Sequence, residues 1–323
     1  MILTILGYDE ILVLFKSKHK GKSDKMNVLS LCDGMSCGQI ALKELNIPID
    51  SYYASEIDKN AIKVTQDNFP NTIQIGDVTK ITEDFLRTLP KIDLVLFGSP
   101  CRSLSKATAG REKYNNGLQG ISWLFYPCND ILQWIKKNNN PNVKFLVENV
   151  DSDKKDDIEE MSNLLGVKPI MIDSNLFSAQ DRKRNYWANI PIAPLPTSCD
   201  AVLKDILDDN VDEKYFYNKP FTYNGDDKKV QATLEMKGHD IIKRVNNKNY
   251  KSPTLTSCRG GNLQKKVYDN GRCRKLTPNE YRKLQTIPDW YKMNVANSHI
   301  YNMCGDGWTI EVIKHIFKGL LDT

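Results

Sequence analysis

The chain has 323 residues, of which 40% are hydrophobic and 26% are charged, as is ordinary for a globular protein. No run of 18 or more apolar residues occurs, which argues against a membrane span and favours a cytoplasmic protein. The net charge of +5 is by itself only a weak indication of a polyanionic partner. The eight cysteines show no C-x-x-C spacing, so we expect neither a zinc site nor another metal centre.

The first 25 residues differ in pattern from the rest of the chain. Residues 1–15 are mostly apolar, and residues 16–25 (KSKHKGKSDK) form a charged linker without periodicity. Met26 then opens a strong pattern of strands and helices. We therefore interpret residues 1–25 as an N-terminal extension outside the catalytic fold.

From Met26 to residue 190, short apolar runs alternate with amphipathic helical stretches. This alternation predicts an α/β fold with a mostly parallel sheet covered by helices on both faces. Strands are expected at 27–31, 51–55, 72–75, 93–97, 144–147 and 169–172, and helices at 39–45, 60–68, 83–89, 121–137 and 156–165. Ligands bind beyond the carboxyl ends of such strands, so functional residues are expected directly after each strand.

Residues 191–275 break the alternation. They are rich in Asn, Lys, Asp and Thr and contain only short strand candidates, which predicts a second, smaller and irregular domain. Residues 237–275 hold eleven Lys and Arg against two acids, so their local net charge of +9 exceeds that of the whole chain. Such a run is usually a solvated face, unless the rest of the chain needs a polyanion. Helical patterns at 278–285 and 309–321 then predict that residues 276–323 return to the first domain.

A glycine loop and two acids follow the first three expected strands. Gly34 and Gly38 permit a tight turn and a close approach of the backbone to a ligand. Glu56 ends the second strand, where an acid accepts hydrogen bonds from ribose hydroxyls, and Asp77 is placed to accept from an adenine amino group. Each acid alone is equally well explained as a helix cap. Features at three successive strand ends favour an adenosine-type ligand.

A cysteine follows the fourth expected strand. A buried structural thiol is the usual fate of a free cysteine. However, Pro100 fixes the backbone just before Cys101, and the polar residues 102–114 are typical of a mobile loop over a site. Cys101 is therefore a candidate nucleophile.

Three charged residues join this candidate. Glu148 follows four largely apolar residues, and a buried carboxylate without a partner is costly. Arg182 and Arg184 alternate along a strand-like segment, so we expect them to project together into the site. Taken singly, a surface basic cluster explains each arginine as well.

From about Met26 to the C-terminus, the chain resembles the DNA cytosine-5 methyltransferases, because its motifs occur in the family's order. The motifs are Leu31–Gly38, Gly98–Cys101, Glu148–Val150, Gln180–Arg184, Arg274–Gln285 and Gly305–Trp308. Cys32 stands where the family usually has Phe, and Asp306 stands where Asn is common. The resemblance implies a Rossmann-like, S-adenosylmethionine-dependent methyltransferase fold with a target recognition domain, and its compact size suggests a bacterial or phage member.

The resemblance also implies roles for individual residues. Cys101 would add to carbon 6 of a flipped cytosine, helped by Glu148, Arg182 and Arg184. The implied S-adenosyl-L-methionine site consists of Leu31, Asp33, Gly34, Ser36, Gly38, Glu56, Ile57, Asp77, Val78, Pro100, Asp306 and Trp308. The implied DNA contacts are Thr254, Leu255, Arg259, Gly260 and Lys265.

The expected partner of a monomeric enzyme of this kind is double-stranded DNA and, in a restriction-modification system, a cognate restriction endonuclease. An RNA (tRNA) cytosine-5 methyltransferase would share the fold and the Pro-Cys chemistry, but the sizeable region 191–275 favours duplex recognition. A catalytically inactive DNA-binding subunit is opposed by the intact Cys101, Glu148, Arg182 and Arg184. A nicotinamide-dependent dehydrogenase would carry G-x-G-x-x-G, which is absent.

Overall fold

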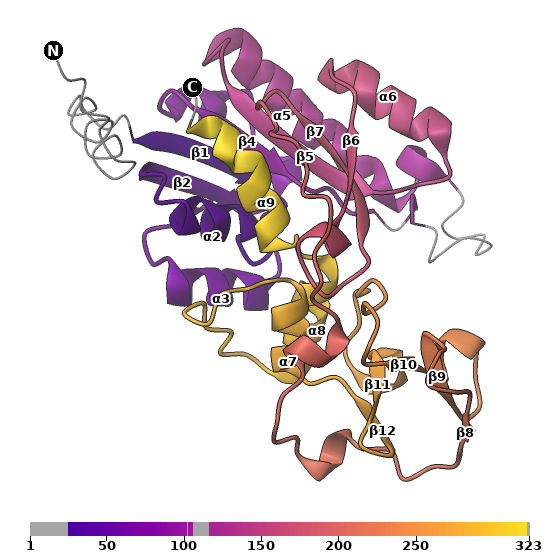
Figure 1. Cartoon of the computed structure of the whole chain (residues 1–323). Coiled ribbons are helices and arrows are strands. Elements are labelled where there is room, and N and C mark those ends of the chain that lie inside the picture. Colours follow the sequence, from indigo (N-terminus) through magenta and orange to yellow (C-terminus); the bar gives the residue numbers. More distant parts are fainter. Residues whose placement is uncertain (1–24, 102, 106–115, 322–323) are drawn as a thin grey trace, which may run out of the picture.

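The computed structural model describes residues 25–101, 103–105 and 116–321 (Figure 1). Among these residues, seven strands form one sheet in the order β3-β2-β1-β4-β5-β7-β6. Neighbours from β3 to β5 run parallel, whereas β7 runs antiparallel to both β5 and β6. The strands are β1 (Met26–Leu31), β2 (Ile49–Ser55), β3 (Ile73–Gln74), β4 (Leu94–Phe97), β5 (Lys144–Val150), β6 (Ile170–Asp173) and β7 (Lys183–Ala188).

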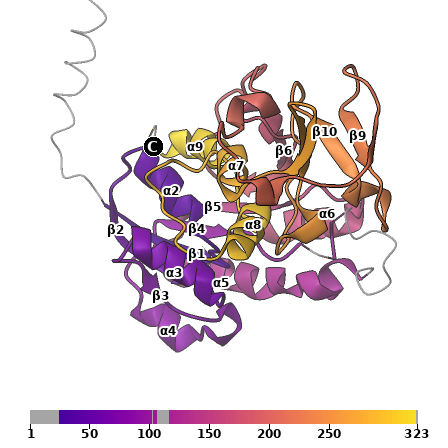
Figure 2. The same ribbon diagram turned by 90° about the horizontal axis from the view of Figure 1, so that it is seen from below.

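Helices cover both faces of this sheet (Figure 2). One face packs on α2 (Cys37–Glu44), α3 (Lys59–Asn68) and α9 (Ile310–Phe317), and the other on α4 (Glu83–Thr88), α5 (Phe125–Asn138) and α6 (Lys155–Leu165). Successive residues of a strand face opposite layers, as Leu94 and Val95 do. The α/β prediction is therefore confirmed, and the six expected strands are all present.

A second sheet lies apart from the first, at the lower right of Figure 1. Within residues 221–275, all of which are described, five strands pair in the order β12-β11-β10-β9-β8. They are β8 (Phe221–Tyr223), β9 (Val230–Leu234), β10 (Arg244–Asn247), β11 (Lys266–Asp269) and β12 (Arg272–Lys275). We call residues 221–275 the small lobe. It is more regular than expected, because strands of three to five residues are too short to show a period.

A buried ion pair fixes the corner between the small lobe and the C-terminal segment. Arg274 of β12 is 0% exposed and places its two terminal nitrogens 2.9 and 2.8 Å from the carboxylate oxygens of Glu280 in α7 (Pro278–Leu284). The same carboxylate accepts from the backbone N–H of Thr277, which caps the helix. The chain thus leaves the small lobe at a defined angle.

The C-terminal segment then returns to the large sheet. It contains α8 (Asn297–Asp306), which the sequence pattern did not predict, and ends with α9 against α2. The described part of the chain contains no helix long and apolar enough to cross a membrane. The expected N-terminal extension lies almost entirely outside the described residues.

Candidate active site

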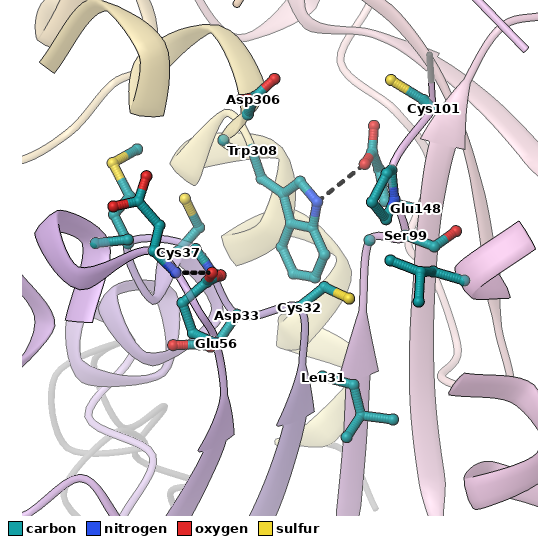
Figure 3. Close-up of a pocket in the computed structure, with 18 of the residues that line it drawn as sticks. Leu31, Cys32, Asp33, Cys37, Glu56, Ser99, Cys101, Glu148, Asp306 and Trp308 are labelled. Carbon is teal, nitrogen blue, oxygen red and sulfur yellow. Dashed lines mark hydrogen bonds between the residues drawn. The ribbon is translucent and has the colours of Figure 1, made fainter. Parts of the chain in front are cut away.

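A cavity of about 790 Å³ lies beyond the carboxyl ends of β1, β2, β4 and β5, where the topology predicts a ligand site (Figure 3). Every residue expected in the catalytic and cofactor sites lines this cavity except Ser36. The side chains that line it but were not predicted include Cys32, Trp123, Asn302 and Met303. Asn302 and Met303 belong to α8, so they could not be placed without that helix.

The glycine loop after β1 is strained and held from within. Cys32, Gly34 and Ser36 have φ angles of 53°, 59° and 56°, in the left-handed region that residues other than glycine rarely adopt. The Asp33 carboxylate accepts hydrogen bonds from the Ser36 hydroxyl and, at 2.8 Å, from the Tyr52 hydroxyl. Burial raises the pKa of Asp33 to about 6. The loop shape is therefore set by its own side chains.

Two predicted cofactor residues have structural tasks in this loop. Ser36 is fully buried and does not line the cavity, and its hydroxyl is already bound to Asp33, so its expected cofactor contact stays a prediction. Gly38 begins α2 so close to β4 that a Cβ atom there would lie 2.5 Å from Leu96 Cδ1. A larger residue would displace the Leu96 side chain.

Both acids bind backbone N–H groups and line the cavity, and Asp77 also caps the short turn Val78–Lys80. Glu56 accepts from the backbone N–H of Gly34 at 2.7 Å and from those of Ile57 and Asp58. Asp77 accepts from the backbone and hydroxyl of Thr79, and these hydrogen bonds lower its pKa. Neither group is fully used, since a carboxylate has about four acceptor positions.

The other end of the cavity holds Cys101 and Glu148 (Figure 3). Glu148 lies inside β5 and not after it, and is only 7% exposed. Its Oε1 is 3.0 Å from Nε of Arg184, and its Oε2 accepts from the indole N–H of Trp308 at 3.0 Å. Burial raises the pKa of Glu148, and the positive charge of Arg184 opposes this. The carboxyl group can therefore hold a proton more readily than one in water.

The Cys101 thiol sits on a rigid turn. The Cys101 carbonyl accepts from the backbone N–H groups of Leu104 and Ser105, both at 2.9 Å. The Asn149 side chain of β5 donates to the hydroxyl and carbonyl of Ser99, which ties β5 to the Pro-Cys segment. Burial raises the pKa of the Cys101 thiol, and the Arg184 charge opposes this rise. The rest of the loop expected at 102–114 lies largely outside the described residues.

Arg182 is held differently from Arg184. Its guanidinium donates to the backbone carbonyls of Leu255, Gly305 and Gly307 at 2.9, 3.1 and 2.9 Å, and the side chain is buried. The two arginines do line one cavity, but only Arg184 pairs with Glu148. The sequence could not separate them, because the three carbonyls come from distant segments.

The residues expected to contact DNA differ in how exposed they are. The side chain of Leu255 is fully buried in the main core, and the expected DNA contact of this residue stays a prediction. Thr254 donates its hydroxyl to the carbonyl of Asp181, and Lys265 is largely buried, which lowers its pKa to about 8. Arg259 is exposed, beside Gly260 whose φ is +100°. Arg259 is thus the one exposed residue of the five.

Among the described residues, no group of three or more His, Cys, Asp or Glu side chains is arranged to hold a metal ion. The cavity instead joins a glycine loop and strand-end acids to a buried pair of thiol and carboxyl groups.

Comparison with known proteins agrees with this arrangement. The family model described as C-5 cytosine-specific DNA methylase matches residues 26–322. The chain is 25% identical to orphan methyltransferase M.SPBetaI of Bacillus phage SPbeta, covering 93% of this chain and 98% of the phage protein. It is 26% identical to type II methyltransferase M1.ScrFI of Lactococcus lactis subsp. cremoris, covering 99% and 83% of the two chains.

The fold also has solved counterparts. The crystal structure of S. pombe Dnmt2 methyltransferase superposes with a TM-score of 0.66 at 16% identity, covering 93% of this chain and 99% of that one. Since the family model spans nearly all of the described fold, the chain belongs to the C-5 cytosine-specific DNA methylases and is a DNA (cytosine-5-)-methyltransferase of bacterial or phage type.

Proposed function

We propose that this protein transfers a methyl group from S-adenosylmethionine to carbon 5 of a flipped cytosine in a specific duplex DNA sequence, with Cys101 as the covalent nucleophile. The observation that carries the proposal is one cavity with two chemically different ends. One end has backbone turns and acids suited to a nucleoside, and the other has a thiol, a carboxyl group and an arginine.

The cofactor end suits S-adenosylmethionine in size and in donor set. The volume of the whole cavity is within the range of small-molecule sites, and at the cofactor end Glu56 and Asp77 can accept from ribose hydroxyls and an amino group. Ile57 is 71% exposed at the cavity and offers an apolar surface to a base. When bound, this group supplies a methyl on a positively charged sulfur. Leu31, Gly34, Val78, Pro100 and Asp306 complete the proposed wall.

The base end supplies the activation that cytosine needs, since its carbon 5 is a poor nucleophile. The Cys101 thiolate forms a bond to carbon 6, and the ring electrons move toward carbon 5 as Glu148 gives a proton or hydrogen bond to ring nitrogen 3. Carbon 5 can then take up the methyl group. Loss of the carbon 5 proton and departure of the thiolate restore the aromatic ring.

Arg184 links the two reacting groups. Its charge stabilises the Cys101 thiolate and pairs with Glu148, and both effects are independent of the DNA sequence. Its remaining donors are suited to the base carbonyl. Arg182, by contrast, would act through the backbone segments it holds.

The DNA is proposed to lie against the small lobe, where the exposed basic residues among 237–275, such as Lys237, Arg244 and Arg259, can neutralise phosphates. Arg259 on its exposed, glycine-flanked turn is the contact that we favour most. A target base must leave the helix to reach a buried thiol such as Cys101. We propose that the enzyme acts as a monomer, and in a restriction-modification system beside a cognate endonuclease.

RNA is the alternative substrate, because a tRNA methyltransferase could use the same thiol and carboxyl groups. The five-stranded sheet of the small lobe would then need another purpose than duplex recognition, and for that reason we favour DNA. An inactive subunit is less well supported, because the thiol, the carboxyl group and Arg184 are all assembled in one cavity.

The covalent step predicts a trapped complex. Fluorine at carbon 5 cannot leave as a cation, so wild-type protein and S-adenosylmethionine should form an adduct with DNA copied throughout with 5-fluorodeoxycytidine. The adduct should survive denaturing electrophoresis. Cys101→Ser should abolish it, since an alcohol ionises far less readily than a thiol with a pKa of about 8.5.

Cys199→Ser, which changes a thiol outside the cavity, is the control and should still trap. A tRNA transcript containing 5-fluorocytidine is the second arm. Trapping of the transcript but not of the DNA would establish the RNA alternative. Trapping that persists in Cys101→Ser would move the nucleophile elsewhere.

The cofactor assignment predicts a binding defect at Glu56. Glu56→Gln should weaken S-adenosylmethionine binding by about tenfold or more. The carboxylate offers two acceptor oxygens, to the Gly34 N–H and to a ribose hydroxyl, whereas the amide replaces one of them with an NH2 group that cannot accept. Isothermal titration calorimetry without DNA measures this. Glu160→Gln, which alters a carboxylate bonded to Tyr126 outside the cavity, should bind as wild type does. Equal affinity of all three proteins would contradict the assignment.

The DNA-binding role of the small lobe predicts a change in salt dependence. Arg259→Ala should weaken duplex binding and reduce the slope of log affinity against log salt by about one, if the guanidinium neutralises a phosphate. Fluorescence anisotropy with a labelled plasmid fragment gives both values. Arg87→Ala removes another exposed arginine, from α4, and should leave the slope unchanged. An unchanged slope in Arg259→Ala would remove this residue from the interface.

A further inference from the structure

Trp308 stands between the two ends of the cavity. Figure 3 shows its indole ring with the glycine loop and Glu56 on one side and with Glu148 and Cys101 on the other. Its N–H donates to Glu148 Oε2 at 3.0 Å, while Arg184 lies 3.0 Å from Oε1. Each oxygen of the carboxyl group is thus held by a donor from a different segment of the chain. Two donors from different directions fix the plane of the carboxyl group.

The contact depends on a glycine. A Cβ atom at Gly98 would lie 2.9 Å from Nε1 of Trp308 and 3.2 Å from Oε2 of Glu148. Both distances are shorter than ordinary van der Waals contact, and the indole ring is not a flexible chain end that moves aside easily. A residue larger than glycine at the end of β4 would therefore separate the indole from the carboxyl group.

The backbone on both sides of Trp308 is also held. The Gly307 carbonyl accepts from Arg182 at 2.9 Å and from the Gln285 side chain at 3.1 Å. The Thr309 hydroxyl donates to the same Gln285 side chain at 2.8 Å. Gln285 is fully buried, so these hydrogen bonds are shielded from water. The indole is thereby aimed by residues that touch neither reacting group.

We propose that Trp308, besides lining the cofactor end, is a positioning residue for Glu148, whose carboxyl group it holds at the angle required to meet ring nitrogen 3 of the target cytosine. This inference rests on the proposed function. The family resemblance suggests only a cofactor contact for Trp308; the hydrogen bond to Glu148 adds an effect on the base. The titratable and charged groups that also face Glu148 are Arg182, Arg184, Tyr186, Asp306, Cys37 and Cys101.

The hydrogen bond has a defined electrostatic sign. An N–H donor favours the ionised carboxylate, so it lowers the pKa of Glu148 against the effect of burial. Removal of the N–H should raise that pKa. A step that needs the protonated carboxyl group is lost as the pH rises through this pKa. The limb of the pH profile that reports Glu148 should therefore move to higher pH.

Exchange of the carbon 5 hydrogen with water measures the effect of Trp308 on Glu148 separately from any effect on cofactor binding. When the thiolate adds to carbon 6, carbon 5 can take a proton from water, lose its original hydrogen and release the thiolate. DNA labelled with tritium at carbon 5 of cytosine should then release tritium into water without any S-adenosylmethionine. The rate needs Cys101 and Glu148 but no methyl donor. Glu148→Gln should lower it by about a hundredfold or more and identifies the limb due to Glu148.

Trp308→Phe keeps an aromatic ring and removes the N–H. Its tritium release should fall about tenfold and its high-pH limb should move up by about one unit, as for the loss of one hydrogen bond to a charged group. Trp290→Phe is the matched control, because Trp290 also donates its indole N–H to a carboxylate, that of Glu44, outside the cavity. It should behave as wild type does. Gly98→Ala, which retains the indole but displaces it, should reproduce the Trp308→Phe profile and serves if that variant does not fold.

An unshifted profile in both Trp308→Phe and Gly98→Ala, with only a weaker affinity for S-adenosylmethionine, would overturn the inference and leave Trp308 as a cofactor contact. Absence of tritium release from DNA in the wild-type protein is a different result. It would contradict the proposed function itself, and this inference with it.

Discussion

The buried guanidinium of Arg182 is the contact on which the rest of the arrangement depends. It donates to carbonyls of Leu255 in the small lobe and of Gly305 and Gly307 at the end of α8. Gln180 completes the join, since its side chain accepts from the Leu255 N–H at 2.7 Å and donates to the Leu284 carbonyl. The backbone N–H and carbonyl of Leu255, next to the proposed DNA-reading surface, are therefore both held by residues that directly precede β7. A hydrophobic residue at position 182 would remove this donor from the carbonyls of Leu255 and Gly305, at about 1–3 kcal/mol each.

This join explains how distant parts of the chain meet in one cavity. The segment that Arg182 holds continues into Trp308, and Trp308 contacts Glu148 inside β5. The small lobe, the cofactor edge and the base-binding edge therefore share a single buried network. The glycine loop at the opposite end is held differently, by Asp33 and Glu56 on a backbone with three left-handed residues. Such strain costs on the order of 1–3 kcal/mol for each residue other than glycine, and it is typical of sites shaped for a ligand.

The sequence predicted the parts of this fold that local patterns encode. Short apolar runs marked the six expected strands, and residues such as Glu56 and Cys101 could be placed because parallel strands end at one edge. Local patterns could not reveal α8, whose buried face is interrupted by polar residues and glycine, or the short strands of the small lobe.

The positions of other site residues depend on partners that are distant in sequence. Arg182 and Leu255 match family motifs, yet the structure buries them and pairs their polar groups with distant residues of the protein. The Arg182 partners lie 73, 123 and 125 positions away, which no periodicity can show. The hydrogen bond between Trp308 and Glu148 spans 160 positions and was missed for the same reason.

Bisulfite sequencing of plasmid DNA from cells that express this protein tests the central claim, methylation of cytosine in duplex DNA, most directly. The account predicts that cytosines in one short sequence context resist conversion in cells with the wild-type protein and convert fully in cells with Cys101→Ser. Complete conversion of the plasmid in both, together with protected cytosines in tRNA from the wild-type cells alone, would contradict the account.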